Sequence, residues 1–110
     1  MSSVYEVYTT EEFDRDFGEL DHSIKLQVEK EVDQLRMNPY VGKPLGYSFF
    51  REKKIKKFRI YYLIYDEYVV VFVIALSEKK DQQGVIDAIR KQIPQYREEI
   101  KKKLPFSSKA

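Results

Sequence analysis

The 110-residue sequence contains no cysteine and a single histidine, His22. The absence of cysteine excludes disulfides and thiolate nucleophiles, and one histidine argues against a histidine-built metal site. The longest apolar run, residues 69–76, is too short to span a bilayer, and the first residues lack the pattern of a signal peptide. We therefore expect a cytoplasmic protein that uses no metal, no small-molecule cofactor and no membrane.

The sequence also has no glycine-rich phosphate loop, no paired-carboxylate motif and no Ser-His-Asp set. It contains no internal repeat, no linker and no low-complexity segment. Its length and its hydrophobic content of 43% suit a single packed core. We therefore predict one domain over residues 1–110, with a flexible tail at 105–110.

Charge is abundant but unevenly divided along the chain. Residues 1–35 contain 3 Lys and Arg against 10 Asp and Glu, and residues 36–110 contain 17 against 8, so the two parts carry −7 and +9. This division predicts an electropositive face that suits a polyanion or an acidic protein, although an ordinary surface of mixed charge would give the same count.

The N-terminal part predicts a short strand and two helices. Residues 3–9 alternate between apolar and polar, as in a strand. Thr9 and Glu12 have the spacing of a capping box at the start of a first helix. A second helix begins after Asp21 or Ser23 and ends before Pro39, because the residue before a proline avoids helical angles.

The remaining sequence predicts three strands and a last helix. Strands are expected near 45–52 and at 58–65 and 68–76, followed by a helix that Pro94 breaks or kinks. The order is β-α-α-β-β-β-α, an α+β domain with a mainly antiparallel four-stranded sheet. We expect the helices on one face of this sheet and the other face free to bind.

Lysines and arginines cluster around the two strongest strands. They are Arg51, Lys53, Lys54, Lys56, Lys57, Arg59, Lys79 and Lys80. A hairpin with a two-residue turn at 66–67 places Arg59 opposite Ile74 and Tyr61 opposite Phe72, with the cations at one end of the sheet. Because like charges repel, such a cluster favours a polyanion such as the phosphates of a nucleic acid.

Two simpler interpretations of the cluster remain open. Lysine-rich turns often serve solubility and prevent edge pairing. Arg59, which lies among apolar neighbours, either forms a structural ion pair with Glu52 or Asp66 or faces a solvent-filled concavity. If the concavity binds nucleic acid, Tyr47, Tyr61 and Tyr62 are candidates to stack on unpaired bases.

The run FRIYYLIYDEYVVVFVIALSEKK at 58–80, preceded by GKPL, resembles the RelE/ParE toxin superfamily of type II toxin–antitoxin modules. The resemblance implies the same β-α-α-β-β-β-α order and a cognate antitoxin with acidic side chains over the basic face. Many of these toxins are ribonucleases that cut mRNA in the ribosomal A site, and others poison DNA gyrase. The resemblance therefore implies mRNA and the ribosome as partners.

The resemblance also implies roles for individual residues. Arg59 matches the strand arginine that contacts the scissile phosphate, and Lys79 matches the basic residue after the last strand. Arg51, Lys53 and Lys54 are the candidates for the cations that the family carries on the preceding strand. Lys53 or Lys54 is a candidate base, because crowding by like charges favours a neutral lysine. The residues expected to bind substrate are Arg51, Lys56, Lys57, Lys80 and Tyr61.

One position departs from the pattern of the family. A tyrosine of the family's C-terminal segment falls at Val85, and the neighbouring Gln82 and Gln83 offer no proton chemistry. We expect a ribosome-dependent mRNA endoribonuclease that cleaves through the ribose 2′-hydroxyl without a metal. The alternative is a non-catalytic binding protein, either a gyrase-type inhibitor or a decayed toxin that retains antitoxin or RNA binding.

Overall fold

The computed structural model describes residues 4–105, so most of the predicted tail at 105–110 lies outside the described residues. The described residues form strands β1 (Glu6–Thr9), β2 (Lys43–Tyr47), β3 (Phe50–Ile55), β4 (Phe58–Tyr65) and β5 (Val70–Glu78). They also form helices α1 (Glu11–Gly18), α2 (His22–Met37), α3 (Gln82–Lys91) and α4 (Ile93–Lys103). Three short 3-10 turns complete the order, namely η1 (Pro39–Val41), η2 (Asp66–Tyr68) and η3 (Lys79–Asp81).

The sheet has the strand order β1-β5-β4-β3-β2. β1 runs parallel to β5 and the other pairs are antiparallel, which confirms the α+β class and the mainly antiparallel sheet. The described part of the chain has five strands rather than the predicted four. The single strand expected near 45–52 is a hairpin, because the chain turns at residues 48–49 and Tyr47 then pairs with Phe50.

The β4–β5 hairpin forms as predicted, but its register differs from the expected one. Four residues rather than two connect the strands, because η2 is followed by Val69 in the left-handed region at φ 54°. A bulge between Tyr61 and Tyr62 shifts the pairing once more. Arg59 therefore lies opposite Ser77 instead of Ile74, and Tyr61 opposite Ala75 instead of Phe72.

The cap of the first helix lies one residue later than predicted. Strand β1 extends to Thr9, so Thr10 is the N-cap and its hydroxyl oxygen accepts from the Phe13 amide at 3.0 Å. The predicted capping box of Thr9 and Glu12 is therefore wrong. In the second helix Asp21 is the N-cap, one of the two residues predicted, and accepts from the Ile24 amide.

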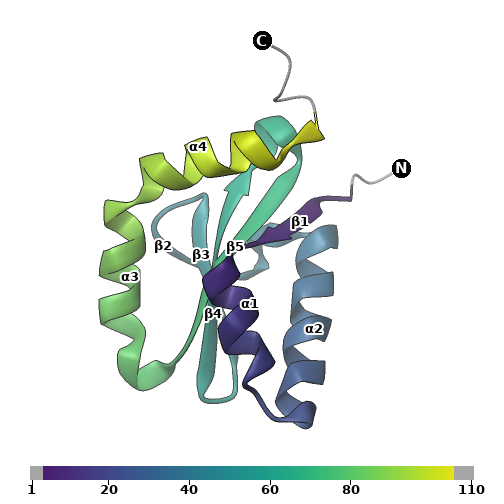
Figure 1. Cartoon of the computed structure of the whole chain (residues 1–110), viewed down its shortest axis with the longest axis vertical. Helices are drawn as coiled ribbons and strands as arrows, with labels where there is room; N and C mark the ends of the chain where they lie inside the picture. Colours follow the sequence, from purple (N-terminus) through teal and green to yellow (C-terminus); the bar gives the residue numbers. More distant parts are fainter. Residues whose placement is uncertain (1–3, 106–110) are drawn as a thin grey trace.

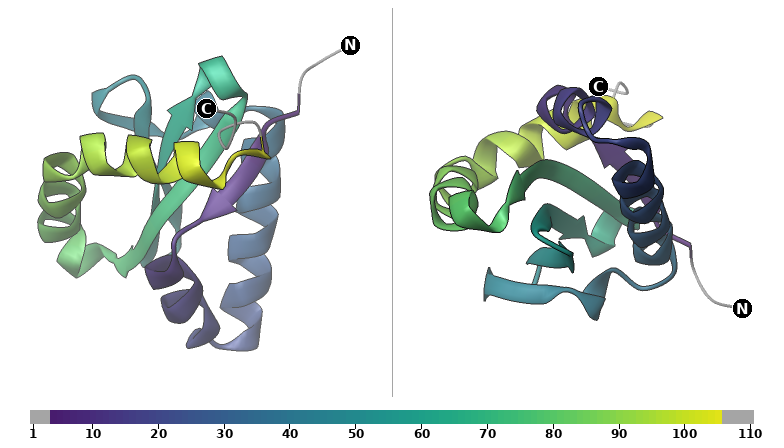
Figure 2. Two further views of the ribbon diagram at one scale, coloured as in Figure 1. Left: turned by 45° about the horizontal axis from the view of Figure 1, so that its top comes forward. Right: turned by 90° about the horizontal axis from the view of Figure 1, so that it is seen from below.

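Helices cover both faces of the sheet, so the prediction of a free face is wrong. Val28 and Leu35 of α2 pack with Tyr62 of β4 on one face. Ile86 of α3 and Ile100 of α4 pack with other residues of β4 and β5 on the opposite face. Figure 1 shows α2 and α3 on opposite sides of the sheet, and the second view in Figure 2 shows the same arrangement. Binding is therefore confined to the edges and rims of the sheet.

The break at Pro94 is confirmed, since α3 ends at Lys91 and α4 begins at Ile93. Proline is tolerated in the first turn of a helix, where its missing N–H would have no intrahelical partner. The chain changes direction sharply between the two helices (Figure 1), which folds α4 over the end of the sheet. Within residues 4–105, no helix combines the length and apolar character needed to cross a membrane.

Candidate nucleic-acid interface

Strands β3 and β4 deliver cations to both faces of the sheet, because successive side chains of a strand alternate. Lys54 pairs with Arg59 across the two strands, on the face that carries Tyr61. Lys53 lies on the other face, where its ammonium is 3.5 Å from the Glu31 carboxylate of α2. Adjacent lysines therefore have different environments.

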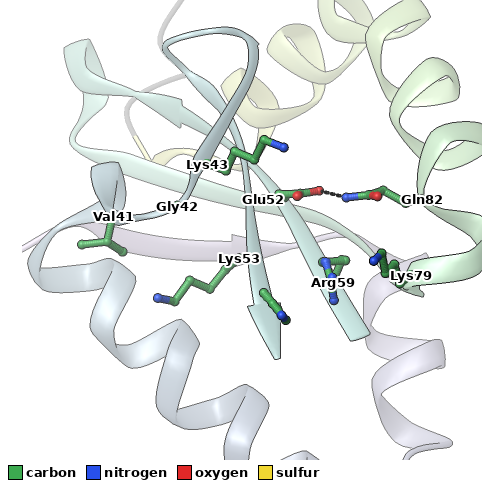
Figure 3. Close-up of a pocket in the computed structure, with 9 residues that line it drawn as sticks. Val41, Gly42, Lys43, Glu52, Lys53, Arg59, Lys79 and Gln82 are labelled. Atoms are coloured by element: carbon green, nitrogen blue, oxygen red, sulfur yellow. Dashed lines mark hydrogen bonds between the residues drawn. The ribbon is translucent and has the colours of Figure 1, made fainter. Parts of the chain in front are cut away.

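These side chains meet in an open depression of about 440 Å³ at one end of the sheet, which we call the basic pocket. Its lining residues are Val41, Gly42, Lys43, Glu52, Lys53, Lys54, Arg59, Lys79 and Gln82. In Figure 3, residues 41–43 form one side of the basic pocket, and Arg59, Lys79 and Gln82 form the other. The four residues predicted as catalytic thus share one cavity with a fifth cation, Lys43, which the sequence analysis did not identify.

Arg59 is buried, with 6% of its surface exposed, yet within residues 4–105 it forms no ion pair. Its Nη1 donates to the carbonyl oxygens of Lys56 at 3.0 Å and Phe58 at 2.9 Å. The structural ion pair with Glu52 or Asp66 is therefore absent, and the guanidinium faces the basic pocket. A buried cation without a paired carboxylate is costly unless water or an anion solvates it.

Glu52 is the one carboxylate that lines the basic pocket, and only 6% of its surface is exposed. Its Oε1 accepts from Nε2 of Gln82 at 2.6 Å, a contact drawn in Figure 3. Gln82 is the first residue of α3, so this hydrogen bond links the helix to the edge of the sheet. Glu52 and Lys54 are two residues apart in β3, so strand alternation places them on the same face of the sheet. This spacing could have indicated from the sequence that Glu52 lies beside the cations.

Arg51 lies outside the lining of the basic pocket. Its guanidinium donates to the carbonyl oxygens of Ser48, Tyr40 and Gly42 at 2.7–2.9 Å and lies over the Tyr40 ring. Lys56 and Lys57 belong to the exposed turn between β3 and β4. These contacts and positions separate three of the predicted substrate-binding cations from the pocket.

Lys80 is exposed beside Lys79 but does not line the basic pocket. Tyr61 is fully buried, its hydroxyl is 2.8 Å from that of Ser77, and burial raises its pKa. Tyr62 is also fully buried. Neither ring can stack on a base in this conformation, which corrects that part of the prediction. Tyr47 remains 43% exposed and stacks on Phe49.

The chemistry available in the basic pocket is that of cations, one carboxylate and one amide. Among the described residues no group of three or more His, Cys, Asp or Glu side chains could hold a metal ion. The pocket lining includes no tyrosine and no histidine. Val85, where the family's tyrosine was expected, packs partly buried against the core. The arrangement therefore suits binding of an anion with several negative oxygens.

Residues 7–83 match the family described as the ParE toxin of the type II toxin–antitoxin system parDE. The fold is similar to that of a double mutant of the E. coli RelE toxin in the free state, with a TM-score of 0.69, 22% identity and coverage of 80% of this chain and 97% of that one.

Two toxin–antitoxin complexes are also similar. The RelBE2 complex of Mycobacterium tuberculosis gives a TM-score of 0.63 at 26% identity, covering 71% of this chain and 94% of the matched one. The intact E. coli RelBE complex gives a TM-score of 0.62 at 24% identity, covering 67% of this chain and 95% of the matched one. No curated protein sequence matches this chain.

Proposed function

This chain belongs to the ParE toxin family of type II toxin–antitoxin systems, and from that premise we propose that it is a ribosome-dependent mRNA endoribonuclease of the cytoplasm. The observation that carries the proposal is the basic pocket. It gathers five cations from β2, β3, β4 and η3 around a single carboxylate. Phosphodiester oxygens of RNA are the ligand that such a charge balance favours.

A cognate antitoxin is the partner that the family supports, since two of the similar structures are toxin–antitoxin complexes. The excess of cations at the basic pocket fits an antitoxin that covers it with acidic side chains. Neutralisation would then follow from simple competition, because antitoxin carboxylates and RNA phosphates would occupy the same cations.

In the proposed reaction, the ribose 2′-oxygen attacks the adjacent phosphorus and the bond from phosphorus to the 5′-oxygen breaks. The products are a 2′,3′-cyclic phosphate and a 5′-hydroxyl, whose oxygen takes its proton from water. Arg59 and Lys79 would hold the nonbridging oxygens and stabilise the charge that develops on them. The buried position of Arg59 fixes its guanidinium before substrate arrives, which is the condition for this kind of stabilisation.

Two groups of the basic pocket are candidates to take the proton from the 2′-hydroxyl. One is Lys54. The other is Glu52, because Gln82 occupies only one of its two carboxylate oxygens. The dependence of the cleavage rate on pH in Lys54→Ala and in Glu52→Gln separates them. The variant whose pH profile equals that of the wild type identifies the group that does not serve as the base.

The test of the proposed function is expression of the wild type and of Arg59→Ala in growing cells, read by toeprinting of translating ribosomes. The wild type is expected to arrest growth and to leave codon-specific cuts in the A site, and Arg59→Ala is expected to do neither. Lys91→Ala, which removes an exposed cation far along α3, is the matched control and should behave as the wild type. A-site cuts that persist in Arg59→Ala count against the proposed site.

A second candidate is a non-catalytic binding protein, either a gyrase-type inhibitor or a decayed toxin that retains antitoxin or RNA binding. The observation that favours it is the absence of tyrosine and histidine from the lining of the basic pocket. Growth arrest without any A-site cut, together with inhibition of DNA supercoiling by gyrase, would support this candidate over the nuclease.

A further inference from the structure

One side of the basic pocket is a short segment, residues 39–43, which we call the strap. It consists of η1, Gly42 and the first residue of β2. Val41, Gly42 and Lys43 of the strap line the pocket opposite Arg59. Lys43 pairs with Glu52 of β3, so its position depends on this pairing and on what holds the rest of the strap in place.

Arg51 is the first anchor of the strap. Its Nη1 donates to the Tyr40 carbonyl at 2.9 Å and to the Gly42 carbonyl at 2.7 Å, and its Nε donates to the Ser48 carbonyl at 2.7 Å. Three carbonyl oxygens on two sides of one guanidinium require a planar fork of donors, which a lysine ammonium cannot reproduce. Arg51, which the sequence pattern suggested as a substrate-binding residue, thus donates to backbone carbonyls before and after β2.

Tyr62 is the second anchor, from the fully buried interior of β4. Its hydroxyl donates to the Pro39 carbonyl at 2.6 Å and accepts from the Gly42 amide at 3.1 Å. Burial raises the pKa of Tyr62 to about 12, so the hydroxyl keeps the proton that it donates. Arg51 and Tyr62 are cross-strand partners, and together they hold Pro39, Tyr40 and Gly42 of the strap.

Gly42 is required by the closeness of this contact. A Cβ at position 42 would lie 2.3 Å from the Tyr62 hydroxyl oxygen and 2.5 Å from the Glu52 carbonyl oxygen. Any other residue would push the strap away from β3. The close contact of Gly42 with Tyr62 and β3 therefore determines where the strap lies, and with it one side of the basic pocket.

We propose that Arg51 and Tyr62 are positioning residues that hold the strap, and that the strap delivers Lys43 as a phosphate-binding cation opposite Arg59 and Lys79. The proposal rests on the proposed function for the identity of the ligand. Its structural half, the anchoring of the strap, stands independently of any ligand.

The first experiment measures hydrogen exchange at the Gly42 amide in the wild type and in Arg51→Lys, which keeps the charge and loses the fork. Exchange is expected to rise about tenfold, because a net hydrogen-bond contribution of roughly 1.4 kcal/mol corresponds to that factor. Exchange at the Leu63 amide in β4 reports on the integrity of the core and should stay unchanged. Arg15→Lys, on the exposed surface of α1, is the matched control.

The second experiment measures affinity for a single-stranded RNA oligonucleotide with 2′-O-methyl groups, which resists cleavage. Arg51→Lys is expected to bind it about fivefold more weakly than the wild type, although the net charge is the same. Lys43→Ala should cost a similar factor in the wild type but little in the Arg51→Lys background. This non-additivity is a readout that a general loss of stability would not produce.

The outcomes distinguish the two proposals. Unchanged exchange at Gly42 in Arg51→Lys, or independent and additive effects of Arg51→Lys and Lys43→Ala on RNA affinity, overturns the positioning role. Increased exchange at Gly42 together with no RNA binding by the wild type supports the anchoring and overturns RNA as the ligand. Arg51→Lys with wild-type RNA affinity would show that Arg51 contributes only charge, which also overturns the proposal.

Discussion

At the Tyr65 end of β4 the charged groups of the hairpin turn have partners within the chain, whereas at the Arg59 end four of the five cations that line the basic pocket have no ion-pair partner among the described residues. Asp66 accepts hydrogen bonds from the hydroxyls of Tyr5 and Tyr40 at 2.7 and 2.5 Å. Glu67 accepts from Arg97 at 2.7 Å. Burial and the hydrogen bond to Asp66 raise the pKa of Tyr40 to about 12. Contacts of Asp66 and Glu67 therefore link the hairpin to Tyr5 just before β1, to η1 and to α4.

At the other end, Lys43, Lys54, Arg59 and Lys79 form no ion pair within residues 4–105. Lys53 is the exception among the cations of the basic pocket, since it pairs with Glu31. The charged side chains at one end of the hairpin thus stabilise the fold, and most cations at the other end are available to bind an anion. The two ends therefore differ in whether their charged side chains have partners within the chain, and not in how densely the charges lie.

The largest expected effect is that of Arg59→Ala on catalysis. Loss of one donor to a developing negative charge lowers kcat by about 10²- to 10³-fold in enzymes where it has been removed. We expect a fall of that size in single-turnover cleavage of ribosome-bound mRNA. Arg59→Lys should recover only part of it, because a lysine lacks the planar fork. If the cleavage rate of Arg59→Ala fell less than threefold, the Arg59 end of β4 would not be the functional end.

Asp66→Ala tests the opposite end of the hairpin. The variant leaves the hydroxyls of Tyr5 and Tyr40 without their shared acceptor, and we expect the free energy of unfolding to fall by about 1–2 kcal/mol. Urea denaturation measures this change. Cleavage by the folded fraction should change less than threefold. A stable Asp66→Ala variant with impaired cleavage would mean that this end takes part in function.

Lys79→Ala tests whether an unpaired cation contributes to RNA binding. Lys79 is exposed and makes no ion pair in the described chain, so its loss should leave the midpoint of thermal unfolding unchanged. Affinity for single-stranded RNA should fall about tenfold, and the slope of log K against log salt should decrease by about 0.7. An unchanged slope would show that Lys79 does not meet a phosphate.

The smallest expected effect concerns the ion pair of Glu67 and Arg97. The hydrogen bond from Arg97 lowers the pKa of Glu67 from its ordinary 4.5. The pair therefore stabilises the fold above pH 4.5, and the stabilisation is lost as the pH falls through the lowered pKa of Glu67 in the folded state. Because both side chains are nearly half exposed, Glu67→Gln should cost less than about 0.5 kcal/mol at pH 7 and a smaller amount at pH 3. Equal costs at the two pH values would contradict this assignment.

Local patterns in the sequence predicted most elements of the fold. Cap residues and the stop before Pro39 indicated both N-terminal helices, and the apolar runs around residues 66–67 indicated the β4–β5 hairpin. The register was wrong because nothing in the sequence marks Val69 as left-handed or announces the bulge after Tyr61. The β2–β3 hairpin was missed because Ser48 and Phe49 are not a typical turn pair.

The site was predictable where one strand or its immediate neighbours carry it. Lys53, Lys54, Arg59 and Lys79 follow from the clustering of basic residues and the hairpin. Lys43 and Gln82 could not be predicted, because tertiary contacts of the strap and of α3 bring them to the pocket. The contacts of Arg51 could not be predicted, because the sequence shows its charge but not the three carbonyl oxygens to which it donates.

The most direct test of the account is an NMR titration of the protein with a 2′-O-methyl single-stranded RNA, observed at both ends of β4. We predict shifts at the side chains of Lys43, Lys54, Arg59 and Lys79 that weaken with added salt, and unchanged signals at Tyr5 and Asp66. Shifts at the Asp66 end, or none at the basic pocket, would contradict the claim that the unpaired cations bind RNA phosphates.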